Sequence, residues 1–168
     1  MPANNAVPHS VDDTSSDWSP NNVATVSEAS GSANEPVVNL DAFRKTYARI
    51  GAAWQAQVLQ KICQFLELTN GWDSYRGQPL KLETGMFALK ILNGVMRTNT
   101  PAPAVVPTAD GGVQFEWHEN DFDLELYIAA PYDCELFYRD HRTNVSDAVP
   151  LRTNFSPLIK QIERLSGN

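Results

Sequence analysis

Residues 113–139 read VQFEWHENDFDLELYIAAPYDCELFYR, and this stretch decides the fold. Apolar residues alternate with polar ones in three runs, at 113–118, 122–128 and 134–139. A period of two is typical of strands that bury one face of a sheet and expose the other. Because only short links separate the runs, the stretch predicts three antiparallel strands in a meander.

The segments on either side of this meander have different characters. Residues 104–107 lie between prolines and predict a short fourth strand at a sheet edge. The following Ala109-Asp110-Gly111-Gly112 predicts a hairpin turn, since Asp-Gly accepts positive φ. Residues 141–154 are mostly polar and predict a loop. The sequence therefore predicts a sheet of three to four strands.

Three helices complete the expected architecture. From Asn39 or Asp41 to about Thr69, apolar residues recur every three or four positions, and a second largely apolar run spans 82–97. A third helix is expected to be capped by Ser156 and to begin with Pro157. The order predicts an α+β domain with two N-terminal helices, an antiparallel meander and a C-terminal helix packed on one sheet face.

The charges divide the chain in two. The net charge is −7, and residues 1–38 contain five acids without a Lys or Arg. Such a polar, acidic segment cannot bury enough apolar surface to fold, so we expect a disordered acidic tail at 1–38 and one domain at 39–168. The domain carries 15 acids and 13 bases without a basic stripe, which argues against direct binding of nucleic acid.

The same composition limits location and cofactors. The sequence has no apolar run of about 18 residues, and its N-terminus lacks a basic segment followed by an apolar one. We therefore expect a cytoplasmic protein that does not enter a membrane. It has no phosphate-binding glycine loop and no Gly-x-Ser-x-Gly motif, so we expect no cofactor.

Between the first two helices lies Asn70-Gly71-Trp72-Asp73-Ser74-Tyr75-Arg76-Gly77-Gln78-Pro79-Leu80. Its glycines and proline predict a loop, and its two aromatic side chains predict that the loop folds back onto the core. Asp73 or Arg76 would then supply hydrogen-bond partners for the indole N–H of Trp72 and the phenol O–H of Tyr75. A ligand-binding loop is the alternative.

The outward face of the predicted sheet mixes charged and aromatic side chains, as protein–protein contact surfaces do. We expect a partner protein to contact this face and the loop, through Trp72, Tyr75, Arg76, Glu116, His118, Glu125, Tyr127, Phe137 and Arg139. The edge strand at 104–107 offers a second route, by pairing with another strand, and so a route to homo-oligomers.

The alternative is an enzyme. Asp73, Glu116 and His118 would be the acid–base residues of a carboxylate- or metal-dependent hydrolase or nuclease-like protein, if the fold brings them together. Carboxylates and imidazoles on an exposed sheet face are more often solvated surface, so we expect no metal site. An acidic decoy of a nucleic-acid-binding protein is a further alternative, although the acidic excess lies in the tail.

Two motifs resemble those of a widespread group of small, uncharacterised bacterial proteins. They are Gly71-Trp72-Asp73-Ser74-Tyr75-x-Gly77-x-Pro79 and Pro103-x-Val105-x-Pro107-x-x-Asp110-Gly111-Gly112-Val113-x-Phe115-Glu116-Trp117. The group reads GWDGYGAxP and PxVxPxxDGGVxLEW, and the likeness covers about residues 40–140. This chain departs from the group at Arg76, where the group has a small residue.

The resemblance implies an architecture and a bacterial or mobile-element setting, and it does not indicate an activity. It marks the following motif positions without a catalytic role: Trp72, Asp73, Asp110, Gly111, Glu116 and Trp117. We expect the loop to pack at the start of the sheet, with Trp72 near Trp117 and Asp73 bound to amides of its own loop. The function that we expect is a non-enzymatic interaction protein, such as an antitoxin-like, immunity or anti-defence partner.

Overall fold

The computed structural model describes residues 53–167 of the 168-residue chain, with side chains from Trp54 onward. The predicted acidic tail at 1–38 and the predicted helical residues at 39–52 lie outside the described residues.

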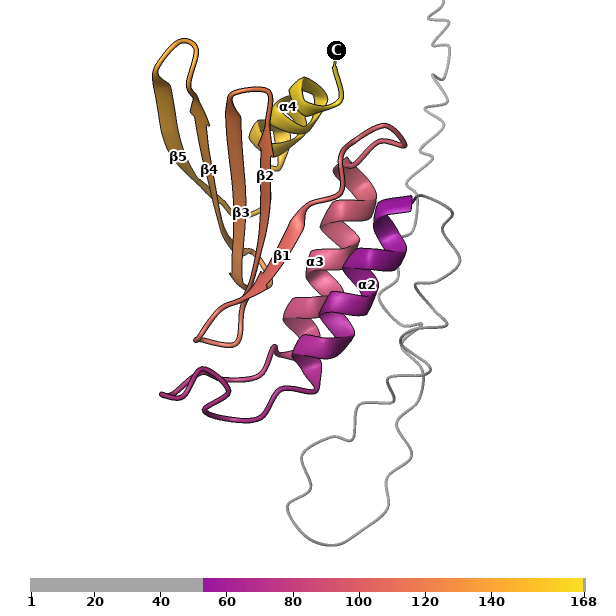
Figure 1. Ribbon diagram of the computed structural model, residues 1–168, viewed down its shortest axis with the longest axis vertical. Coiled ribbons are helices and arrows are strands. Elements are labelled where there is room, and N and C mark those ends of the chain that lie inside the picture. Colours follow the sequence, from indigo (N-terminus) through magenta and orange to yellow (C-terminus); the bar gives the residue numbers. More distant parts are fainter. Residues whose placement is uncertain (1–52, 168) are drawn as a thin grey trace, which may run out of the picture. The chain divides into compact units, whose positions relative to one another are not determined.

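The described residues form three helices and one sheet of five strands (Figure 1). The helices are α2 (Ala53–Leu66), α3 (Leu82–Val95) and α4 (Ser156–Leu165). The strands are β1 (Ala104–Pro107), β2 (Val113–Glu119), β3 (Phe122–Ala130), β4 (Asp133–Asp140) and β5 (Val145–Leu151). The α+β class and the antiparallel sheet are confirmed.

The sheet has the order β1-β2-β3-β4-β5, and every neighbouring pair is antiparallel. The prediction of three to four strands was wrong, because β5 lies in the segment that we predicted to be a loop. Most of β5 is exposed, and it joins the sheet through backbone pairing with β4. β1 lies at an edge, as predicted.

All three helices pack on one side of this sheet. α3 lies against β2 and β3, α2 lies against α3 and β1, and α4 lies against α3. Gly85 of α3 allows a close approach to α2, since a Cβ there would lie 3.2 Å from Cγ2 of Ile62. Between the layers, Phe115, Trp117 and Leu126 are almost completely buried. None of the helices in the described part of the chain is both long and apolar enough to cross a bilayer.

An ion pair joins α4 to the end of the sheet. Nη2 of Arg164 lies 2.5 Å from Oδ2 of Asp140, and the guanidinium lies 4.0 Å from the ring centre of Phe122. The expected cap of α4 was wrong: Phe155 is the N-cap residue, and the side chain of Asn154 accepts the hydrogen bond of the Ser156 amide. Helix α4 thus closes the core on the side where the sheet is buried.

Candidate functional site

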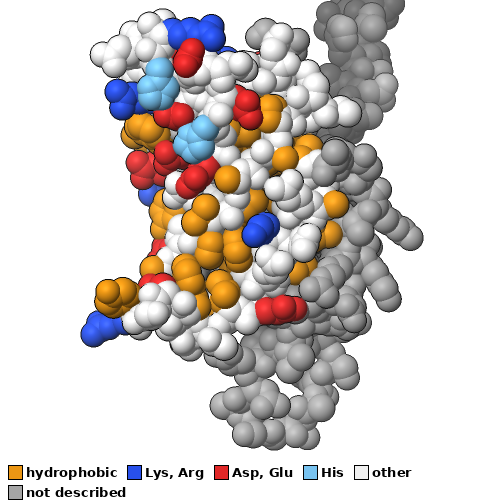
Figure 2. Space-filling view, viewed as in Figure 1, with side chains coloured by type: hydrophobic (Ala, Val, Ile, Leu, Met, Phe, Trp, Pro, Cys, Tyr) orange, Lys and Arg blue, Asp and Glu red, His pale blue; other side chains and the backbone are white. Residues whose placement is uncertain are grey.

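One face of the sheet has none of the described helices against it, and we call it the open face. Cross-strand register places its side chains on one side of the sheet. Figure 2 shows the two described histidines beside acidic side chains, with hydrophobic side chains gathered next to them. The open face consists of Ala104, Val106, Gln114, Glu116, His118, Asp123, Glu125, Tyr127, Glu135, Phe137 and Arg139 on β1 to β4.

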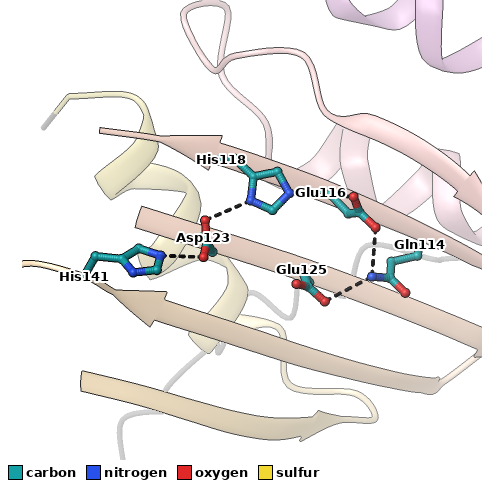
Figure 3. Close-up of polar contacts among 6 residues, drawn as sticks. All are labelled: Gln114, Glu116, His118, Asp123, Glu125 and His141. Carbon is teal, nitrogen blue, oxygen red and sulfur yellow. Dashed lines mark hydrogen bonds and ion pairs between the residues drawn. The ribbon is translucent and has the colours of Figure 1, made fainter. Parts of the chain in front are cut away.

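At one end of the open face, Asp123 lies between two histidines (Figure 3). Its Oδ1 lies 2.8 Å from Nδ1 of His118, and its Oδ2 lies 2.6 Å from Nε2 of His141. The hydrogen bond to Asp123 is the main cause that raises the pKa of His118, and the same bond is the main cause that lowers the pKa of Asp123. His141 follows β4 directly, so the turn after that strand delivers the second imidazole.

Next along the face, two glutamates lie directly opposite each other. Glu116 of β2 pairs with Glu125 of β3, and the side-chain amide of Gln114 donates to both carboxylates, over 3.1 and 3.0 Å (Figure 3). Nε2 of His118 lies 3.7 Å from Glu116. Like charges in directly opposed positions destabilise a sheet, so the neutral Gln114 only partly compensates this pair.

The third polar group lies at the start of β2. The hydroxyl of Tyr127 donates to Oδ2 of Asp110, and the hydroxyl of Thr108 donates to Oδ1 of Asp110 over 2.6 Å. Burial and the neighbouring Asp110 raise the pKa of Tyr127 to about 12. Burial opposes the charged form of Asp110, but the hydrogen bonds of Thr108 and Tyr127 outweigh it and lower its pKa.

Between these groups the face is hollowed. The hollow has a volume of about 360 Å³. Its walls combine two carboxylates, two aromatic rings and two neutral polar groups, which are those of Glu125, Glu135, Tyr127, Phe137, Gln114 and Thr108. We call it the acidic hollow. Glu125 pairs with Phe137, and Tyr127 pairs with Glu135, so acids and rings alternate across β3 and β4.

The loop at 70–80 is held by its own side chains. Oδ1 of Asp73 accepts hydrogen bonds from the amides of Tyr75 and Gly77, over 2.9 and 2.8 Å, which confirms the expected role of Asp73. These bonds, the one from Gly77 foremost, lower the pKa of Asp73. A Cβ at position 77 would lie 2.8 Å from Nε1 of Trp72, so any other residue there requires its neighbours to shift.

The loop is also joined to the start of the sheet, as expected. Gln78 forms an isolated parallel bridge with Asp110, and the amide of Lys81 donates to the carbonyl of Gly111. Gly111 has φ +81°, and a Cβ there would lie 2.9 Å from the carbonyl oxygen of Pro79. The glycine of the second motif thus permits the contact with the first.

The tip of the loop differs from the prediction. Tyr75 is 87% exposed, and Arg76 is exposed beside it, so the expectation that both aromatic residues pack onto the core was wrong for Tyr75. Ser74 precedes them with φ +69°, in the left-handed region of the backbone. The indole of Trp72 takes its partner from the backbone, since it donates to the carbonyl of Gln78 and not to Asp73.

The expected proximity of Trp72 and Trp117 was also wrong. Trp72 binds the carbonyl of Gln78, which bridges Asp110 before the start of β2. Trp117 lies towards the other end of β2 and donates to the carbonyl of Pro101 over 2.9 Å. The two indoles therefore fix different segments.

The candidate acid–base residues of the enzyme hypothesis are only partly brought together. Glu116 and His118 are neighbours, whereas Asp73 binds the amides of its own loop. None of the three lines the acidic hollow. Within residues 53–167, no group of three His, Cys, Asp or Glu side chains is arranged to hold a metal ion.

The structure adds residues that our sequence analysis did not assign to the surface. Glu135 and Thr108 line the hollow, and His141 joins Asp123. Glu135 was detectable, since it alternates with Cys134 and Leu136 on the predicted outward side of its strand. His141 and Thr108 lie beyond strand ends, where alternation gives no signal.

We compared the chain with protein-family models, curated proteins and solved structures, and none of the three comparisons found a match.

Proposed function

We propose that this chain is a non-enzymatic binding protein that docks onto another protein through the open face and the loop tip. The observation that carries the proposal is the exposure of Tyr75, 87%, at the tip of a loop that Asp73 holds in place. Tyrosine and arginine are enriched among residues that dominate binding energy, and Tyr75 and Arg76 are adjacent here.

The bracing of the loop supports the same function. A partner that binds a flexible loop must pay for ordering it, whereas a preorganised loop binds without that loss. Two hydrogen bonds to Asp73 and the bridge from Gln78 to Asp110 fix the loop before any partner arrives. An exposed aromatic residue on a fixed support has no evident role in the stability of the fold.

The open face extends this surface. Tyr127 and Phe137 are half-buried among charged side chains, a mixture typical of protein–protein contacts. Gln78 of the loop forms a bridge with Asp110, and Asp110 accepts the hydrogen bond of Tyr127 on the open face. The loop therefore lies next to the part of the open face that contains Tyr127. The accessory role, as an antitoxin-like, immunity or anti-defence partner, belongs to the same proposal, and the resemblance of the two motifs supports only its bacterial or mobile-element setting.

The test uses the full-length chain as bait in extracts of the source organism. We compare the wild type with the Y75A/R76A double variant and with Ile159→Ala, which truncates an exposed apolar side chain on α4. A stoichiometric partner kept by the wild type and Ile159→Ala but lost by Y75A/R76A is the expected result. Equal retention by all three, or no retained partner, would contradict the proposal.

A further inference from the structure

We propose that the acidic hollow receives an arginine side chain of the partner protein. This inference rests on the proposed function and names the chemistry of its partner. None of the helices within residues 53–167 covers the open face, and the charges of this face are unbalanced. Acids at positions 116, 123, 125 and 135 outnumber the single Arg139, and both described histidines contact Asp123.

The first argument is that none of the described residues lining the hollow is a Lys, Arg or His, and that His118, 3.7 Å from Glu116, lies outside this lining. Glu116 and Glu125 are directly opposed, and only the neutral amide of Gln114 contacts both. Glu135 and Arg139 form no ion pair with a described residue. A cation placed in the hollow lies beside Glu125 and so reduces the repulsion between Glu125 and Glu116.

The second argument is the alternation of acids and rings. Glu125 and Glu135 are diagonal neighbours on β3 and β4, and Tyr127 and Phe137 form the other diagonal. Diagonal positions of a sheet are about 7–8 Å apart. A guanidinium group carries five N–H donors in one plane, so it donates to both carboxylates while its face rests on a ring.

The third argument distinguishes arginine from lysine. An ammonium group is compact and strongly hydrated, whereas a guanidinium is planar and more weakly hydrated and stacks on aromatic faces. The hollow offers rings as well as acids, and its volume of about 360 Å³ accommodates the long side chain with its planar head. We therefore assign arginine, presented by a protein, as the occupant.

The test is a titration of the ¹⁵N-labelled full-length protein with N-acetyl-arginine methylamide, followed by amide chemical shifts. The neutral citrulline analogue has the same shape without the charge and serves as the control ligand. We expect saturable shifts at Glu125, Tyr127, Glu135 and Phe137 with the arginine compound and none with citrulline. The E125Q/E135Q variant is expected to bind at least tenfold more weakly.

A matched variant, E83Q/E119Q, removes two exposed acids outside the hollow and is expected to bind like the wild type. Its binding separates a local effect from a change in net charge. Unchanged affinity of E125Q/E135Q, equal shifts with citrulline, or shifts centred elsewhere would overturn the inference. Equal affinity for the lysine analogue would overturn the assignment of arginine.

Two further results separate this inference from the proposed function. If the partner is lost by Y75A/R76A but kept by E125Q/E135Q, the proposed function stands and the arginine inference is wrong. A concentration-dependent dimer, lost in both Arg76→Gln and E125Q/E135Q during sedimentation, would identify a second copy as the source of the arginine. That result would contradict the inference that the arginine belongs to a different protein.

Discussion

The backbone amide of Gly77 donates a 2.8 Å hydrogen bond to Oδ1 of Asp73, and this contact closes the loop that carries Tyr75 at its tip. The same oxygen accepts the amide of Tyr75. One carboxylate therefore fixes the backbone on both sides of Arg76. These contacts explain the spacing of Asp73 and Gly77 in the first motif, because this carboxylate and this glycine amide together hold the tip of the loop.

Gly77→Ala tests this account of the loop. The added Cβ would lie 2.8 Å from both Cγ of Asp73 and Nε1 of Trp72, so the loop must shift. We expect the free energy of unfolding to fall by about 1–3 kcal/mol, the usual cost of overpacking, in urea denaturation. Gly94→Ala is the control, since its Cβ meets no atom within 4 Å. A loss in the control as large as that at position 77 would contradict the account.

The pair of Asp140 and Arg164 predicts an acid-sensitive step in stability. The hydrogen bond from Arg164, the main cause, lowers the pKa of Asp140. A lowered pKa means that the stabilisation is complete above the ordinary value of about 4 and is lost as the pH falls towards the folded-state value. We expect Asp140→Asn to unfold at lower urea than the wild type near neutral pH.

This difference is expected to shrink as the pH falls below about 4, because protonation removes the same charge from the wild type. Asp147→Asn, at an exposed acid of β5, is the control. A difference between Asp140→Asn and the wild type that stays constant with pH would show that the ionised pair does not stabilise the fold.

The histidine cluster makes a prediction that nuclear magnetic resonance can read directly. We expect the pKa of His118 to lie above 6.5, because Asp123 and then Glu116 favour the charged imidazole. Asp123→Asn should lower it towards the ordinary value. The stabilisation by this pair is present below about 6.5 and is lost as the pH rises through the raised pKa. An unchanged pKa of His118 in Asp123→Asn would contradict the geometry.

The two motif tryptophans are expected to differ in their contributions. Trp117 is 2% exposed and donates to the carbonyl of Pro101, so Trp117→Phe removes a buried hydrogen bond and leaves a cavity. We expect a loss of about 1–3 kcal/mol in the free energy of unfolding. Trp72→Phe, at a half-buried position, should cost less. Equal losses would show that the two indoles are equally integrated into the core.

The sequence was sufficient for the parts of the fold that bury one regular face. Strands β2, β3 and β4 alternate over most of their length because one side of each is buried, and their bounds lie within two residues of those that the alternation predicts. Strand β5 was missed because it lies at an edge. Its inward positions include Asp147 and its outward ones include Pro150, so the period of two is broken.

The surface was less predictable than the fold. The outward residues of β2 to β4 could be listed, but the opposition of Glu116 and Glu125 depends on the register between strands. The exposure of Tyr75 was predicted wrongly, because an aromatic residue in a loop is normally buried. Here Asp73 and Gly77 satisfy the backbone locally, and the tip does not need the core.

The most direct test of the proposed function is hydroxyl-radical footprinting of the full-length protein, free and in complex with the partner that it retains. Tyr75 should be oxidised in the free protein and protected in the complex, together with Phe137 on the open face. Tyr132 is 49% exposed and packs on Phe87 of α3, so its oxidation should not change. Protection of Tyr132 with unchanged oxidation of Tyr75 and Phe137 would place binding elsewhere and contradict the account.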